Sequence, residues 1–518
     1  MSIKKFLNLP KNSVSQKTET VEYKTNNLTT YLGQKGYTLQ KNELTQEQID
    51  WIKKELTVKP MVQNSGFAGS TTNQASFPVY RESQNKIYTP RYFGEQHFGL
   101  PKEYKLDEGN DISVPFVGEL REYQKPAVEA YLKHVTNGGG GLFDLYCAFG
   151  KTSISLFIAS ALKKKTLVIV HKEFLMNQWI ERIQQFLPSA RIGKIQGQVI
   201  DIENKDIVLG MLQSLSMKDY PSNMFNSFGF TIIDEVHHIS SEVFSCALFK
   251  LVTKYMLGLS ATMNRKDGTT KVFKMFLGDV VYKAEREEIH KVVVRAIDYI
   301  SNDDDFKEVV TDYRGNVQYS TMITKLCCYN PRSEFILSVL KGLLLEEDSE
   351  KKQIMILAHN KNLLEYLFNA IKTREIASVG YYVGGMKEAA LKESESKKVI
   401  IATYSMAAEA LDIKTLNTLI MATPKTDIEQ AVGRILREKH GSPVVVDIID
   451  EHTTFRNQWS KRKSFYKKQN YKIIRTTSVR YNADCTTWKV EREQEEKLID
   501  KNSDVFQGKC LLKSFLKK

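Results

Sequence analysis

Two short clusters of residues have the types and the order needed to bind and hydrolyse a nucleoside triphosphate. In the first, Gly150, Lys151 and Thr152 follow the apolar run 141–145 and precede a segment with helical periodicity. At such a junction a lysine neutralises phosphate charge, a threonine hydroxyl ligates Mg²⁺, and the first N–H groups of the helix face an anion. Because Leu145 stands where a complete GxxxxGKT loop has its first glycine, the cluster alone also fits an ordinary helix start with a solvent-facing lysine.

The second cluster is a pair of acids, Asp234 and Glu235, directly after the apolar run 230–233. Carboxylates at the C-terminal end of a buried strand lie at the edge where α/β sheets bind ligands. We expect Asp234 to hold Mg²⁺ through water, and Glu235 to orient and deprotonate the attacking water. The alternative is an acidic surface turn, and the apolar run before the pair argues against it.

Both clusters fall in residues 111–285, where short apolar or β-branched runs alternate with helical segments. These runs are 141–145, 166–170, 206–211 and 228–233. The same rhythm returns in residues 331–454, with runs at 353–359, 398–403, 418–423 and 442–450. The spacing predicts an α/β fold of two domains in tandem, each with a parallel sheet that is buried on both faces.

The segments outside these two domains have a different character. Residues 1–30 are polar, without an apolar period, and predict a flexible terminus. Residues 31–110 mix polar and aromatic residues, and we expect a small α+β accessory module there. Within it, residues 45–56 predict a helix with Thr45 as N-cap, residues 79–94 predict a hairpin, and residues 66–73 predict a flexible loop. Residues 286–330 are expected to be a connection or an insertion.

The net charge of +13 is unevenly placed along the chain. Residues 455–518 hold 17 Lys or Arg against 7 Asp or Glu, so we expect a basic tail with an anionic partner. Basic residues that alternate with aromatics suit a nucleic-acid backbone or single strand, whereas the alternatives are a solvated tail or a helix packed on the second domain. The residues concerned are Trp459, Lys461, Arg462, Lys463, Phe465, Tyr466, Lys467, Lys468 and Tyr471.

Composition narrows the setting in which the protein acts. The six cysteines are scattered and form no CxxC pair, which indicates a reducing compartment, and we expect no structural metal. No apolar run is long enough to span a bilayer, and the first residues lack the pattern of a secretory signal. We therefore expect a cytoplasmic or nuclear protein without a membrane partner.

The two clusters resemble the motifs of the superfamily 2 DExH helicases, and further segments resemble the other motifs of that core, in the family's order. These segments are 120–130, 166–183, 208–215, 258–262, 400–413 and 427–438. The resemblance implies two RecA-like domains, ATP and Mg²⁺ in the cleft between them, and nucleic acid across both. It implies an ATP-dependent DNA helicase or translocase.

The resemblance also implies roles for single residues. Gln124 would read adenine, while Arg434 and Arg437 of the second domain would reach the γ-phosphate with Gln430 beside them. The cradle for the phosphates would comprise Tyr146, Cys147, Ala148, Phe149, Gly150, Lys151 and Thr152. The residues that would couple hydrolysis to nucleic acid are His237, Ser260, Thr262 and Asp412.

Three segments, 88–94, 171–179 and 258–268, resemble the XPB-like branch, which includes helicases of large DNA viruses such as the poxvirus transcript-release helicase. This branch favours DNA as the track and implies a DNA-contacting module before the core, for which residues 31–110 are the candidate. A viral relative would further imply a transcription complex as partner, and the host cytoplasm or the virion as location. An RNA helicase and the motor subunit of a restriction system are the alternatives, and the oligomeric state stays open.

Overall fold

The computed structural model describes most of the chain. The described residues are 28–59, 76–146, 149–221, 223–237, 242–261, 263, 270–284, 291–346, 349–409, 413, 415–436, 442–494 and 509–510. The predictions made for residues 1–27 and for the loop 66–73 lie outside them, as do those for Cys147, Ala148, Thr262, Asp412 and Arg437.

The N-terminal part folds into a small α+β module, as predicted. Its elements are β1 (Thr30–Gly33), β2 (Gly36–Gln40), α1 (Gln46–Glu55), β3 (Thr57–Val58), β4 (Phe77–Pro78), β5 (Arg81–Glu82), β6 (Lys86–Thr89), α2 (Arg91–Phe98) and β7 (Glu103–Tyr104). Thr45 caps α1 by accepting a hydrogen bond from the backbone of Gln48, which confirms the predicted helix start. The hairpin is confirmed only for β5 and β6, because Pro90 ends the strand and starts α2.

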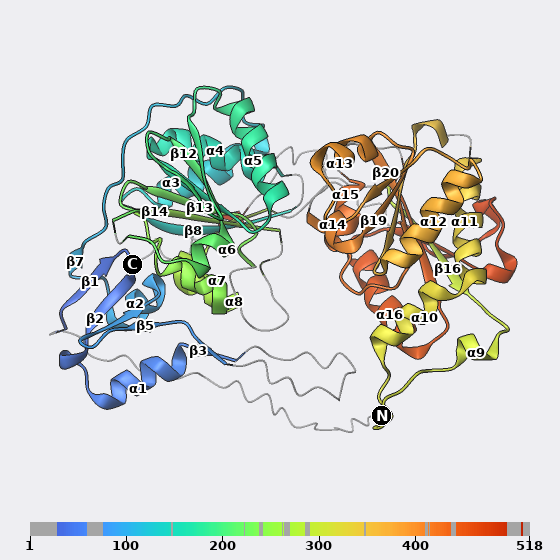
Figure 1. The fold of residues 1–518 in the computed structure, drawn as a ribbon, viewed down its shortest axis with the longest axis horizontal. Helices are drawn as coiled ribbons and strands as arrows, with labels where there is room; N and C mark the ends of the chain where they lie inside the picture. The colour runs from blue at the N-terminus through green and yellow to red at the C-terminus, as the bar shows by residue number, and fades with distance from the viewer. Residues whose placement is uncertain are drawn as a thin grey trace, which may run out of the picture.

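The module packs against the first large domain through α2 (Figure 1). The Tyr92 hydroxyl of α2 donates to the carbonyl of Gly140 at 3.2 Å, in the strand that leads to the phosphate loop. Apolar residues of the module and of one face of the first large sheet form a continuous cluster. The module is therefore built onto this domain.

The first large domain contains a nine-stranded sheet in the order β11-β10-β12-β9-β13-β14-β8-β15-β24. Its elements are α3 (Lys125–His134), β8 (Gly139–Leu145), α4 (Lys151–Leu162), β9 (Thr166–Val170), α5 (Glu173–Phe186), β10 (Ile192–Gln196), β11 (Val199–Asp201), β12 (Ile207–Met211), α6 (Leu212–Met217), β13 (Phe230–Ile233), α7 (Glu242–Leu248), β14 (Tyr255–Ser260), α8 (Thr270–Leu277), β15 (Val280–Ala284) and the late strand β24 (Lys509–Cys510). In this sheet order, the seven neighbouring strands β10-β12-β9-β13-β14-β8-β15 are parallel to one another. Clusters of buried apolar residues lie on both faces of the sheet.

The second large domain contains an eight-stranded sheet in the order β18-β19-β17-β20-β21-β16-β22-β23. Its elements are β16 (Val293–Tyr299), α9 (Asp304–Lys307), α10 (Tyr319–Cys328), α11 (Asn330–Leu344), β17 (Gln353–Ala358), α12 (Lys361–Thr373), β18 (Val379–Tyr382), α13 (Glu388–Glu395), β19 (Val399–Thr403), α14 (Tyr404–Glu409), β20 (Leu416–Met421), α15 (Glu429–Arg434), β21 (Val444–Asp450), α16 (Thr453–Lys468), β22 (Lys472–Thr477) and β23 (Lys489–Arg492). All but β23 are parallel to their neighbours, so the prediction of two parallel-sheet domains in tandem is confirmed.

The segment that was expected to be a basic tail is folded into the second domain as far as Gln494. Strand β22 pairs with β16, which itself belongs to this sheet although its residues were expected to lie in a connection. On α16, Arg462 is fully buried and the aromatic rings of Trp459 and Tyr466 lie in the core, so the packed-helix alternative is the correct one for these side chains. Arg462 can be buried because it forms an ion pair with Asp447 of β21, and composition does not reveal such a partner.

The two large domains lie side by side, with α5 of the first facing α13 of the second (Figure 1). The Asn177 amide donates to Glu388 at 2.8 Å, and the Lys392 ammonium lies 2.9 Å from the Glu181 carboxylate. Among the described residues, no helix combines the length and the apolar character that crossing a membrane requires.

Candidate nucleotide site

The loop between β8 and α4 has a backbone that only glycine adopts easily. Gly150 has a φ of +92°, and α4 begins at the next residue, Lys151. A Cβ on Gly150 would lie 2.3 Å from the side-chain nitrogen of Gln124, so a side chain does not fit. Within the described residues no side chain caps α4, and the first N–H groups of this helix are placed to face an anion.

Gln124 holds one end of this loop in place. Its side chain, 4% exposed, accepts from the backbone of Arg121 at 3.0 Å and donates to the carbonyl of Phe149 at 2.7 Å. The Phe149 ring is itself buried and packs edge-on against Tyr123 and Tyr146, with centroids 5.2 and 5.3 Å away. The ring of Phe149 therefore belongs to the core, and both polar groups of its backbone have partners, because its N–H donates to the carbonyl of Tyr146 at 3.3 Å. The place of Phe149 in the phosphate cradle stays a prediction. The role of Gln124 in reading adenine stays a prediction.

The acid pair follows β13, which lies two strands away from β8 in the sheet, with β14 between them. Both oxygens of the half-buried Asp234 carboxylate accept hydrogen bonds at 3.0 Å, one from the indole of Trp179 and one from the backbone of Glu235. Burial and the charge of Glu235 raise the pKa of Asp234, against the opposing effects of Lys151 and the Trp179 indole. Glu235 has a φ of +49°, a left-handed conformation that costs a non-glycine residue energy and is concentrated at functional sites.

The two clusters meet at the carboxyl edge of the sheet. The Lys151 ammonium lies 3.2 Å from the Glu235 carboxylate, and both side chains are largely buried. Glu235 also lies 3.4 Å from the imidazole of His237, which in turn contacts the Ser260 hydroxyl at 3.1 Å at the end of β14. The structure thus brings together four of the residues predicted from their motifs, from segments more than 100 residues apart in the chain.

The donors at this edge suit a hard divalent cation. Asp234 offers a carboxylate and Thr152, which is half-buried at the start of α4, offers a hydroxyl. Within the described residues no three His, Cys, Asp or Glu side chains gather into a metal cage. Mg²⁺ fits such a sparse set, because it commonly keeps several waters and is held by one or two carboxylates together with substrate phosphates.

The second domain presents the short helix α15, with Gln430 and Arg434 both half-buried. Glu429 at its start remains accessible to water, yet its pKa is raised because of desolvation by nearby protein and the like charges of Asp427 and Asp144. Because Asp144 belongs to β8, this effect indicates that the start of α15 is near the strand that carries the phosphate loop.

Two buried arginines that sequence reasoning did not assign to the site hold the loop between β20 and α15. Arg332 of α11 donates to the carbonyl of Ala422 at 2.8 Å, and Arg462 of α16 donates to that of Lys425 at 3.0 Å. Each is also paired with a buried aspartate of β21. Trp179 was likewise missed as a partner of Asp234. Neither spacing nor periodicity reveals such contacts between distant segments.

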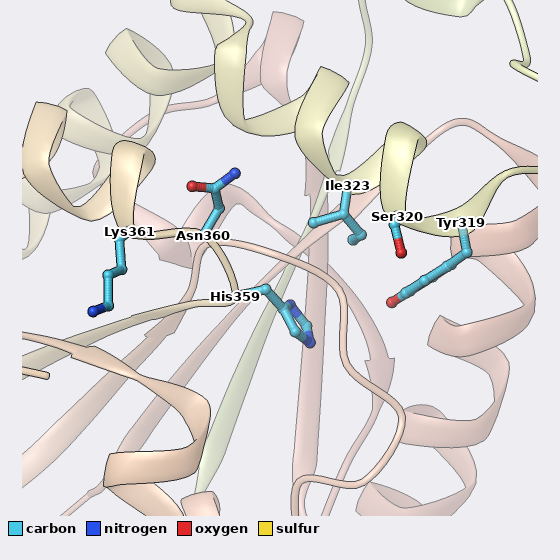
Figure 2. Close-up of a pocket in the computed structure, with 6 residues that line it drawn as sticks. All are labelled: Tyr319, Ser320, Ile323, His359, Asn360 and Lys361. Carbon is cyan, nitrogen blue, oxygen red and sulfur yellow. The ribbon is translucent and has the colours of Figure 1, made fainter. Parts of the chain in front are cut away.

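An open pocket of about 450 Å³ lies on the second domain where β17 ends, and the sequence did not point to it. In Figure 2, α10 supplies Tyr319, Ser320 and Ile323, while the junction of β17 and α12 supplies His359, Asn360 and Lys361. The Asn360 side chain caps α12 by accepting from the backbone of Asn362 at 2.8 Å. Desolvation and the nearby charge of Lys425 lower the pKa of His359 to about 4, so its ring is neutral at pH 7.

Two parallel-sheet domains in tandem, with a GKT loop after one strand and a DEVH segment after another, define a class of proteins with two RecA-like domains that use ATP. Comparison with known protein families agrees with this class. Residues 118–265 match the family described as "Type III restriction enzyme, res subunit", and residues 336–439 match "Helicase conserved C-terminal domain".

Sequence identity to individual proteins identifies the family of this chain. It is 35% identical over 462 residues to a "Putative ATP-dependent RNA helicase" of Acanthamoeba polyphaga mimivirus, covering 86% of this chain and 87% of the relative. It is 27% identical over 440 residues to "DNA 3'-5' translocase XPB2" of Sulfurisphaera tokodaii, covering 76% and 98%. The chain therefore belongs to the superfamily 2 helicases, in a group with relatives in large DNA viruses, and it is an ATP-dependent helicase or translocase.

A solved structure supports the fold. S. cerevisiae Dbp5 bound to RNA and ADP BeF3 has a TM-score of 0.50 and covers 70% of this chain and 91% of its own, at 14% sequence identity. At that identity the likeness concerns the fold alone.

Proposed function

We propose that this protein hydrolyses ATP at the carboxyl edge of the first sheet, with Lys151 binding the β- and γ-phosphates and Glu235 activating water. The observation that carries the proposal is the 3.2 Å contact between the Lys151 ammonium and the Glu235 carboxylate beside the start of α4. Thr152 and Asp234 would hold Mg²⁺, which neutralises phosphate charge when it is bound. When a phosphate draws Lys151 away, the Glu235 carboxylate loses its contact with this ammonium and becomes a better proton acceptor.

The second domain would complete this site. Arg434 and Arg437, with Gln430 beside them, would stabilise charge on the transferred phosphoryl group when the two domains close. The nearness of the start of α15 to Asp144 of β8 supports this arrangement. Arginines in this role contribute roughly a thousandfold or more to the rate. Hydrolysis and domain closure are then one event, which is what stepping along a nucleic acid requires.

For the track, we favour DNA, in keeping with the 27% identity to a protein named as a DNA translocase. The pocket beside β17 supports phosphate contact on the second domain, because Ser320 and Lys361 line it next to the N-terminus of α12. Contacts of this kind read the backbone and not the bases, so we expect little sequence specificity. The accessory module, residues 31–110, is a further candidate for DNA contact, and a viral transcription complex is the proposed setting.

RNA is the second candidate for the track, because the relative with 35% identity is named as an RNA helicase. The deciding experiment compares the stimulation of ATP hydrolysis by duplex DNA, single-stranded DNA and single-stranded RNA of one sequence. Stronger stimulation by either form of DNA supports our proposal, and stimulation by RNA alone overturns the choice of DNA.

The site itself is tested by Glu235→Gln. We expect turnover to fall by at least about 100-fold, which is typical of losing a general base, while binding of a fluorescent ATP analogue is retained. Turnover within twofold of the unaltered protein would show that Glu235 does not activate water.

A further inference from the structure

The indole of Trp179 makes a direct hydrogen bond to the acid pair. Trp179 lies in the middle of α5, is 1% exposed, and its Nε1 donates to Oδ2 of Asp234 at 3.0 Å. The other oxygen of this carboxylate, Oδ1, accepts from the backbone N–H of Glu235 at the same distance. Two donors from different elements therefore fix the plane of the Asp234 carboxylate. Each oxygen has a second lone pair that can still face a cation or its water.

We propose that Trp179 is a positioning residue that holds the Asp234 carboxylate in the orientation needed to bind a divalent cation. The inference rests on the proposed function, in which Asp234 binds Mg²⁺. An indole N–H is suited to this task because it only donates, it does not ionise, and its ring is held rigidly by the core. Partners of this kind orient a metal ligand, and their loss typically weakens metal binding by 10- to 100-fold.

A purely structural role for Trp179 makes a different prediction. Leu175, Met176 and Ile183 of the same helix are also buried and fill the space between α5 and the sheet without contacting the acid pair through a polar atom. If Trp179 only fills space, removing its N–H should weaken binding of the divalent cation no more than removing a comparable volume at Ile183 does. The test therefore compares Trp179→Phe, which removes the N–H and keeps an aromatic ring, with Ile183→Ala as the matched control.

The measurement is the dissociation constant of Mn²⁺, a spin probe for Mg²⁺ sites, titrated into the full-length protein with ADP present. The paramagnetic resonance signal of unbound Mn²⁺ reports binding without any turnover. We expect binding to weaken about 10- to 100-fold in Trp179→Phe and to stay within about twofold in Ile183→Ala. Affinity for ADP without metal should be unchanged in both variants.

Two outcomes would overturn the inference: Mn²⁺ binding by Trp179→Phe within twofold of the unaltered protein, or equal losses in both variants. Asp234→Asn separates this result from failure of the proposed function. If Asp234→Asn binds Mn²⁺ normally, Asp234 is not the metal ligand and the site assignment fails. If it loses Mn²⁺ while Trp179→Phe does not, the site assignment stands and only the role of Trp179 is wrong.

A second measurement needs no altered Trp179, in case Trp179→Phe does not fold. The unaltered protein labelled with ¹⁵N-tryptophan has four indole N–H signals, and Phe variants of Trp51, Trp459 and Trp488 assign that of Trp179 by elimination. We expect the chemical shift of the Trp179 signal with MgADP to differ from its chemical shift with ADP alone. A Trp179 signal that does not respond to Mg²⁺ would contradict a contact with the metal carboxylate.

Discussion

Arg462 of α16 offers a stringent test of how the second domain is held together. Its side chain is fully buried and contacts the carboxylate of Asp447 at 2.7 and 2.8 Å. Arg462→Ala would leave this buried carboxylate with the Tyr466 hydroxyl, 2.9 Å away, as its remaining donor among the described residues. Removing one partner of a buried ion pair costs about 3–5 kcal/mol, because the other charge stays desolvated. The same change removes the hydrogen bond that Arg462 donates to the Lys425 carbonyl in the loop before α15.

Thermal unfolding followed by circular dichroism measures this loss. A domain of this size loses about 2–4 °C per kcal/mol, so the melting temperature of the second domain should fall by roughly 6–20 °C. Lys461→Ala is the matched control, since it removes an exposed charge from the same helix and should change stability by less than about 0.5 kcal/mol. A fall of under about 2 °C in Arg462→Ala, or equal falls in both variants, would refute the claim that this residue is part of the core.

Three further predictions concern the nucleotide and the track. Lys151→Ala should abolish nucleic-acid-stimulated ATP hydrolysis, and turnover near that of the unaltered protein would remove Lys151 from the site. Gly150→Ala should weaken binding of a fluorescent ATP analogue, because its Cβ would lie 2.3 Å from Gln124 and displace the loop, and an unchanged dissociation constant would contradict this. Joint replacement of the exposed Lys467 and Lys468 by alanine should flatten the slope of log affinity for DNA against log salt by about 0.9 per lost phosphate contact, and an unchanged slope would exclude both from the DNA interface.

The strands that carry the site were predictable because each is a short apolar run followed by a motif with its own chemistry. Residues 166–170 form β9 with the predicted bounds, and the run before Asp234 forms β13. The strands of a parallel sheet that is buried on both faces need apolar side chains on both sides, so each strand is an apolar run in the sequence. The meeting of Lys151 with Glu235 follows from the strand order, because both residues come after the carboxyl ends of strands in one sheet.

The failures share a physical cause, which is that a contact between distant segments leaves no periodic pattern. Composition made the C-terminal part look like a basic tail, whereas Arg462 is neutralised by Asp447 inside the second domain. The strand β16 was expected to lie in a connection, and its place between β21 and β22 depends on neighbours that come more than 140 residues later. The bond from Trp179 to Asp234 spans 55 residues, and α5 looks from its sequence like any helix with an apolar face.

The central claim is that ATP is hydrolysed at a site shared by two domains, and Arg434→Ala tests it most directly. In single-turnover hydrolysis of ATP with saturating nucleic acid, we predict a rate about a thousandfold lower than that of the unaltered protein, with binding of ATP to the first domain retained. A rate within a fewfold of the unaltered protein would contradict the claim, because the first domain would then hydrolyse ATP without the arginine of the second.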